Sequence, residues 1–168
     1  MAAGNTYEAI ATQTTSSSVA SVTFSSIPST YTDLVLISNV YKTGGSGQSG
    51  VFQVNGDTGT NYSFTYINGN GTSASSGRVS SNTYGCFDLW GQSMSDTTFE
   101  EHALNFMNYS NTTTYKTILY RGNAVNKGVE QGVNLWRSTS AITSVVLYIQ
   151  AGSFVSGSVF SLYGIKAA

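Results

Sequence analysis

Apolar and polar residues alternate with a period of two in several segments of the chain. Tyr62, Phe64 and Tyr66 are separated by single residues, and so are Leu104 and Phe106. Successive side chains of a β-strand point to opposite faces, so this spacing gives a strand one apolar face and one other face. No window shows the i, i+3, i+4, i+7 apolar spacing of an amphipathic helix. The pattern therefore predicts an all-β protein.

Residues that favour turns separate these segments. The stretches 44–50 and 68–77 are mostly Gly, Ser, Asn and Thr, and Asn55-Gly56 supplies residues that tolerate a positive φ. Many short strands with regular turns favour an antiparallel β-sandwich, jelly-roll-like, with about ten or eleven strands. We expect strands near residues 7–13, 19–25, 33–41, 51–55, 62–68, 84–90, 102–109, 115–121, 131–136, 142–150 and 159–166.

The chain is long enough to bury one core, and no domain boundary is visible. Its 168 residues match an ordinary domain, so we expect a single β-sandwich domain over residues 1–168. The single cysteine, Cys86, excludes an internal disulfide. It alternates with an apolar neighbour, which favours a small buried side chain.

Charge is scarce in this sequence. Charged residues make up 9%, and seven Lys and Arg against eight Asp and Glu give a net charge of −1. These are too few cations for a phosphate-neutralising surface, so we expect no nucleic-acid partner. Aromatic residues make up 12%, which is typical of a folded chain, and solubility then depends on hydroxyl and amide groups.

The sequence shows no signal for export or for a membrane. Residues 1–13 lack the basic and apolar regions of a signal peptide. The longest aliphatic runs, 34–37 and 145–149, are far shorter than the roughly 20 residues that cross a bilayer. We expect synthesis in a cytoplasm and no membrane partner.

Three predicted strands are apolar or aromatic on both faces: residues 34–37, 86–90 and 145–149. The outer face of a sandwich strand in a monomer should be polar. Two apolar faces therefore predict a contact with another subunit. The alternative is a central strand whose second face is covered by a long loop of the same chain.

Candidate catalytic residues are few. His102 is the only histidine, and Glu100 would share its face on a strand, so a carboxylate–imidazole pair is conceivable. No G-x-S-x-G motif places a nucleophile near it, which favours a polar cluster at the start of a strand. Spacing singles out no pair of acids for glycoside hydrolysis. We expect no enzymatic activity and no catalytic residue.

The segment from Asn55 to Asn61 carries oxygen ligands of the kind that calcium prefers. It offers one carboxylate, Asp57, and two amides, but lacks the distal Glu of an EF-hand. A turn whose Asn and Asp side chains bond the local backbone is the favoured interpretation. We therefore expect no metal and no cofactor.

Tyrosine, serine, glycine and asparagine are abundant, and these residues are typical of recognition surfaces. Tyrosine gives a large contact area at low entropic cost, while Ser and Asn give adaptable hydrogen bonds. Burial in the core is the default expectation for about half of the candidate tyrosines, and the rest could line a protein interface or stack on sugar rings. The interface candidates are Tyr41, Tyr62, Tyr66, Tyr109, Tyr115 and Trp136.

Four segments, in chain order, resemble structural proteins of tailed bacteriophages, notably those of cyanobacterial and marine hosts. The first, near the N-terminus, comprises residues 12–18, 22–28 and 31–34, and the second is residues 54–63. Residues 136–144 and 159–165 resemble a later block and the closing strand, while residues 84–130 match less clearly.

The resemblance implies a virion protein with a β-sandwich fold. Strand pattern begins by about Tyr7 with no long shaft ahead of it, so we expect a stand-alone module rather than a tail-fibre domain. We predict a non-enzymatic capsid decoration (cement) protein on the outer capsid surface. Its partners would be itself, as a homo-oligomer and most simply a homotrimer, and the major capsid protein. The alternative is a receptor-binding module of a tail fibre or capsid fibre that recognises host-surface carbohydrate.

Overall fold

The computed structural model describes residues 6–43, 49–89, 99–124 and 128–166. Within these ranges it contains fourteen strands, and it has no helix long and apolar enough to cross a membrane. The strands are β1 (Tyr7–Thr14), β2 (Ser21–Phe24), β3 (Asp33–Val40), β4 (Lys42–Thr43), β5 (Gly50–Val54), β6 (Tyr62–Gly69), β7 (Ala74–Asn82), β8 (Gly85–Asp88), β9 (Glu100–Met107), β10 (Lys116–Ala124), β11 (Gly128–Trp136), β12 (Val145–Ile149), β13 (Ser153–Phe154) and β14 (Val159–Ile165).

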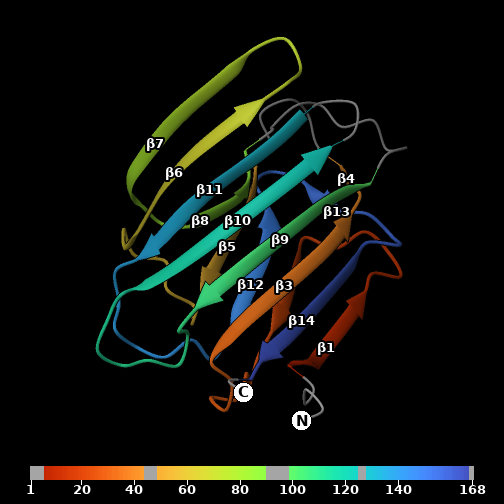
Figure 1. Cartoon of the computed structure of the whole chain (residues 1–168). Helices are drawn as coiled ribbons and strands as arrows, with labels where there is room; N and C mark the ends of the chain where they lie inside the picture. Colours follow the sequence, from red (N-terminus) through yellow and green to blue (C-terminus); the bar gives the residue numbers. More distant parts are fainter. Residues whose placement is uncertain (1–5, 44–48, 90–98, 125–127, 167–168) are drawn as a thin grey trace.

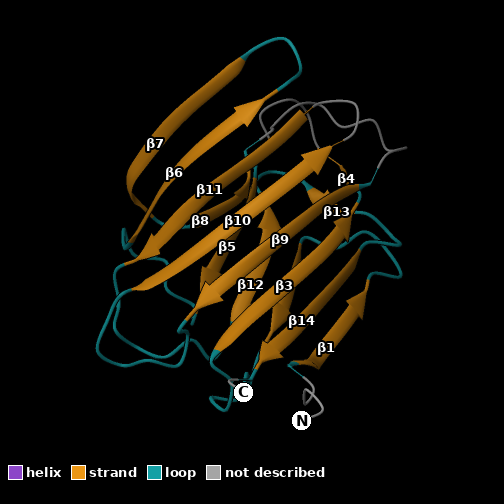
Figure 2. Ribbon diagram, in the orientation of Figure 1, coloured by secondary structure: helices purple, strands orange, loops and turns teal. Residues whose placement is uncertain are grey.

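Two antiparallel sheets make up most of the fold (Figures 1 and 2). The larger has eight strands in the order β1-β14-β3-β9-β10-β11-β6-β7, and the smaller has four in the order β2-β12-β5-β8. Strands β13 and β4 form a short third sheet. The predicted antiparallel β-sandwich is confirmed, with more strands than the ten or eleven expected.

The hydrophobic core lies between the two large sheets. Leu34 and Leu36 of β3 stand opposite Phe106 and Leu104 of β9, and all four are fully buried against residues such as Leu147 of β12. These are the residues that recur every second position in the sequence. The period of two is therefore the alternation between the core and the opposite face of the sheet.

Strand β7 was not predicted. We expected residues 68–77 to form a loop, but β7 begins at Ala74 and pairs with β6. β7 is the edge of the eight-stranded sheet, and none of its residues is buried. A strand with no buried face has no apolar alternation, so the pattern cannot reveal it. Strands β4 and β13 have two residues each and are too short to show an alternation of apolar and polar residues.

The three segments predicted to be apolar on both faces have different environments. In the first, Ile37 is 48% exposed on the face that points away from the core. In the second, Cys86 is buried beside Phe64, so the same chain covers it, and Trp90 lies outside the described residues. In β12, the second face is half-buried. Among the described residues of the three segments, Ile37 in the first is the large aliphatic side chain that is exposed.

A buried amide joins β8 to the eight-stranded sheet. Oδ1 of Asn134, on β11, accepts a hydrogen bond of 2.7 Å from the N–H of Cys86, and its Nδ2 donates one of 2.8 Å to the carbonyl of the same residue. Asn134 is fully buried, so both of its polar groups are paired as burial requires. This link holds β8, and with it Asp88, close to β11, which carries Glu130.

Candidate functional site

The outer face is the side of the eight-stranded sheet that points away from the four-stranded sheet. The register aligns Asn105, Leu119, Val133 and Thr65 in one row across β9, β10, β11 and β6. Exposed apolar surface that gathers on one face is typical of an interaction site rather than of a solvated sheet. Six large aliphatic side chains of this face are exposed: Ile37, Ile67, Met107, Leu119, Val129 and Val133.

A groove of about 1040 Å³ lies at one end of the outer face. It crosses strands β3, β9, β10, β11, β6 and β7, which stand side by side in the sheet (Figure 1). Its volume is at the upper end of the range that holds small ligands, about 300–1,000 Å³. Aliphatic and polar side chains alternate along its walls, among them Ile37, Asn39, Ile67, Glu101, Arg121 and Gln131.

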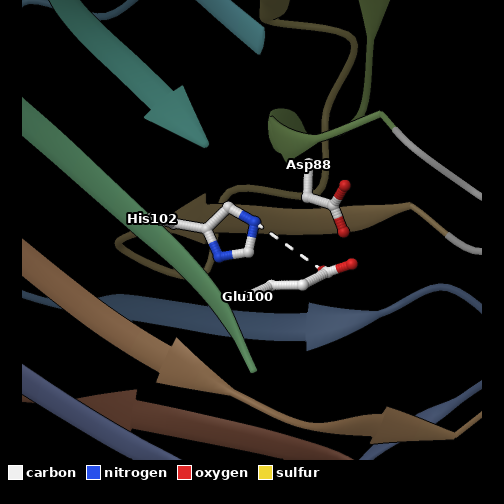
Figure 3. A group of neighbouring side chains, drawn as sticks. All are labelled: Asp88, Glu100 and His102. Atoms are coloured by element: carbon white, nitrogen blue, oxygen red, sulfur yellow. Dashed lines mark ion pairs between the residues drawn. The ribbon is translucent and has the colours of Figure 1, made fainter. Parts of the chain in front are cut away.

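Five ionisable residues are buried together between the sheets, and we call them the charged cluster: Lys42, Asp88, Glu100, His102 and Glu130. The Lys42 ammonium forms ion pairs with Asp88 and, at 3.1 Å, with Oε2 of Glu100. Nε2 of His102 is 4.0 Å from the same Glu100 oxygen, too far for a hydrogen bond (Figure 3). Buried charges are stable only when paired in this way.

His102 and Glu130 lie on either side of Gly122 in the sheet register. A Cβ at Gly122 would be 2.7 Å from Cδ2 of His102, so a glycine is needed for the imidazole to occupy this position. Both carboxylate oxygens of Glu130 accept the N–H of Leu89, at 3.0 and 3.2 Å. These contacts place Glu130 and His102 side by side beneath the groove.

Burial shifts both of these groups toward their neutral forms. It raises the pKa of Glu130 to about 7, although the hydrogen bond from Leu89 and the charge of Lys42 oppose the shift. It lowers the pKa of His102 to about 3, and the positive charge of Lys42 adds to this effect. His102 is therefore a neutral imidazole at physiological pH.

One atom from each of Asp88, Glu100 and His102 lies within 4.8 Å of the other two, a spacing that suits a bound cation. The cation that the structure places there is the Lys42 ammonium, which forms ion pairs with both carboxylates. A metal ion would have to displace this charge or share the site with it. The donor set therefore fits an internal ion pair better than a metal centre.

Glu100 and His102 share one face, as predicted, and both are buried, but the neutral imidazole and the carboxylate form no hydrogen bond with each other, which agrees with the favoured polar cluster. Ser38 stands directly opposite His102 on the neighbouring strand, a proximity that the sequence did not reveal. Its buried hydroxyl has no hydrogen-bond partner among the described residues, so it forms no nucleophile–base pair with the imidazole there. A substrate has no direct access to these groups, because all three side chains lie inside the sandwich.

The six aromatic interface candidates do not share one surface. Tyr62, Tyr109 and Trp136 are 0%, 0% and 2% exposed and belong to the core, so they are not available for an interface. Tyr41 and Tyr66 are half-buried, and Tyr115 is 55% exposed. Alternation shows that a residue shares a face with its second neighbours, but not which face is inside, and this is why the sequence misplaced the first three.

The turn from Asn55 to Asn61 is held by its own polar side chains. The Asp57 carboxylate accepts the N–H of Gly59 at 2.8 Å, Nδ2 of Asn61 at 2.9 Å and Nε1 of the buried Trp136 at 2.6 Å. Burial raises the pKa of Asp57, but these hydrogen bonds outweigh it and lower the pKa below its usual value. The oxygens that calcium would need already accept donors from the protein, as the favoured interpretation predicted.

Replacing Asp57 by alanine should lower the free energy of unfolding by about 1–3 kcal/mol, because the indole N–H of Trp136 loses its acceptor in the core. Urea denaturation of the two proteins measures the difference. Added calcium or EDTA should change neither midpoint. A calcium-dependent rise in stability that the variant lacks would show instead that the turn binds the metal.

No protein-family model matches the sequence, and no curated protein matches it. Among solved structures, the chain is similar to the galectin LEC-6 of Caenorhabditis elegans, with 8% identity, a TM-score of 0.40, and 95% of this chain and 97% of that chain covered. The alginate lyase of the marine animal Aplysia kurodai has 12% identity and a TM-score of 0.37, with 84% and 72% covered. The alginate lyase Aly36B has 11% identity and a TM-score of 0.36, with 89% and 72% covered. Likeness this distant assigns no function.

Proposed function

We propose that the chain is a non-enzymatic virion structural protein, a capsid decoration (cement) protein of a tailed bacteriophage. It would bridge subunits of the major capsid protein on the outer capsid surface and associate with itself, most simply as a trimer. The sequence resemblance to phage structural proteins motivates this assignment. The observation that carries it is the outer face, where six large aliphatic side chains are exposed on one side of a sheet.

The physical mechanism is bridging through a neutral surface. A specific interface buries about 1,600 Å² in total, and many copies on one shell would add many such contacts. The outer face carries few charged side chains. Docking it to a neighbour therefore removes water from few charges, and the loss of this hydration is the main cost of a charged interface. The hydrogen-bonded pairing of the eight strands would keep this face in a fixed shape.

Phage particles assembled without this protein should break at a lower temperature than complete particles, and added purified chain should restore their resistance. Val133→Asp places a charge in the middle of the outer face and should abolish this restoration. DNA release on heating measures both effects.

The matched control for this test is Thr23→Asp, at an exposed position of β2 on the other sheet. It adds the same charge and should restore the particles as well as the unmodified chain does. Circular dichroism would establish that both variants fold. Equal activity of the two variants, or equal heat resistance with and without the protein, would contradict the proposal.

The groove favours a second candidate, the carbohydrate-recognising module of a tail fibre or capsid fibre. Its volume and its polar walls suit a ligand that enters the sheet surface rather than a flat protein neighbour. Location on the particle separates the two candidates. Labelled antibodies against the chain would mark the shell lattice in the first case and the fibres in the second.

A further inference from the structure

We propose that the groove on the outer face binds a neutral glycan chain, with Arg121, Asn123 and Gln131 as its main hydrogen-bonding groups. This inference rests on the glycan-recognition alternative above and names the site and the ligand class. Because Ile37, Ile67 and Val129 belong both to the groove and to the apolar outer face, a bound glycan and a docked capsid subunit would compete for this end of the face.

The polar side chains of the groove have hydrogen-bonding capacity to spare. Arg121, Asn123 and Gln131 are exposed, and among the described residues their side chains hydrogen-bond to no other protein group. Arg121 stands opposite Gln131 in the register, and Asn123 stands opposite Glu101 on the other neighbouring strand. Neighbouring strands are about 4.7–4.9 Å apart, so these groups form a regular array across the sheet.

The chemistry of this array matches sugar hydroxyl groups. Each amide both donates and accepts hydrogen bonds, the guanidinium of Arg121 donates, and the carboxylate of Glu101 accepts. A sugar hydroxyl also does both, so a row of hydroxyls can pair with such a row of side chains. Ile37, Ile67 and the exposed Val129 supply apolar contacts for the C–H groups of the rings.

The charge of the groove favours a neutral sugar over an anionic one. Its exposed walls carry one guanidinium, from Arg121, and one carboxylate, from Glu101, so positive charge is not in excess. The Glu130 carboxyl lies buried beneath and adds no positive charge. A uronate chain would meet at least as much repulsion as attraction, whereas a neutral chain meets no charge repulsion. The described lining has no Tyr, Trp or Phe, so the affinity should be modest, with Kd in roughly the micromolar to millimolar range.

Titration of the full-length ¹⁵N-labelled chain with defined hexasaccharides tests the inference. The probes are maltohexaose, cellohexaose, mannohexaose and, as the anionic comparison, hexagalacturonate. We expect at least one neutral probe to shift the amide resonances of Ala103, Arg121 and Gln131, which line the groove, and to bind more tightly than hexagalacturonate. Arg121→Ala should weaken that binding roughly tenfold or more, since a hydrogen bond from a charged group is lost.

Two further variants test whether binding takes place in the groove. Arg78→Ala removes the same charge from an exposed position of β7 outside the groove and should leave Kd unchanged. Ala103→Trp fills the groove from its floor and should abolish binding while the circular dichroism spectrum stays the same. Preference for hexagalacturonate, equal effects of the two arginine variants, shifts confined to other surfaces, or no binding of any probe would each overturn the inference. The heat resistance of particles is a separate measurement, so failure of glycan binding and failure of the capsid role can be told apart.

Discussion

Replacing Lys42 by methionine is expected to lower the free energy of unfolding by about 3–5 kcal/mol, the largest loss among the substitutions considered. Methionine keeps most of the apolar length of the side chain but removes the ammonium. The carboxylates of Asp88 and Glu100 would then remain buried without the cation with which both form ion pairs. Removing the cation of a buried ion pair is costly because the remaining charge loses compensation away from water, and Asp88 and Glu100 are each 2% exposed. Urea denaturation at neutral pH measures the loss.

The matched control is Lys166→Met, which breaks the ion pair between Lys166 and Glu8. These side chains are 47% and 34% exposed, so water screens the pair and solvates the remaining carboxylate. The control should therefore change the midpoint much less than Lys42→Met. Similar effects of the two substitutions would show that Lys42 does not compensate buried charge, and our account of the charged cluster would be wrong.

The second large effect is a pH dependence that Glu130 and His102 produce together. The pKa of Glu130 is raised from 4.5 to about 7, so the folded state holds a proton that the unfolded chain releases between these values. Stability from this group is complete below pH 4.5 and is lost as pH rises toward 7. The pKa of His102 is lowered from 6.5 to about 3, so its contribution is complete above pH 6.5 and is lost as pH falls toward 3.

The two contributions cancel in the interval between the two ordinary pKa values. From pH 4.5 to 6.5 the unfolded chain carries its proton on His102, while the folded chain carries one on Glu130. The number of bound protons is then equal in the two states, and these groups give no slope of stability against pH. Stability should fall above this interval because of Glu130 and below it because of His102. Lys42, Asp88 and Glu100 are the charged groups packed around these two residues.

Glu130→Gln should remove the loss at high pH while keeping an acceptor for the N–H of Leu89. The variant should be more stable than the unmodified chain by about 3 kcal/mol at pH 8 and nearly equal to it at pH 4, which urea denaturation at the two values would measure. The control is Glu101→Gln, on the exposed outer face, which should change stability by about 0.5 kcal/mol or less at both values. A constant difference across pH would contradict the assignment of the slope to Glu130.

Only part of the buried charged cluster could be predicted from the sequence. That Glu100 and His102 share one face followed from the period of two alone. Lys42, Asp88 and Glu130 could not be added to them, because they lie on β4, β8 and β11, which belong to three different sheets, and they meet only through strand order and sheet packing. Ser38 comes to lie opposite His102 through the register of β3 against β9, which no local pattern specifies. The groove was missed for a related reason, since its wall combines residues of six strands, one of which is the unpredicted β7.

The sequence by itself determined that this chain folds as a sandwich of antiparallel strands, because alternating apolar residues can be buried only by placing one face of each strand inward. It also determined that little charge is available for any partner. Tertiary structure alone decided which aromatic residues are inside, as with Tyr62 and Trp136, and which aliphatic ones remain outside, as with Leu119 and Val133. The physical reason is that alternation fixes the relative faces of a strand, whereas the order of strands and their register decide which face meets the second sheet and which meets solvent.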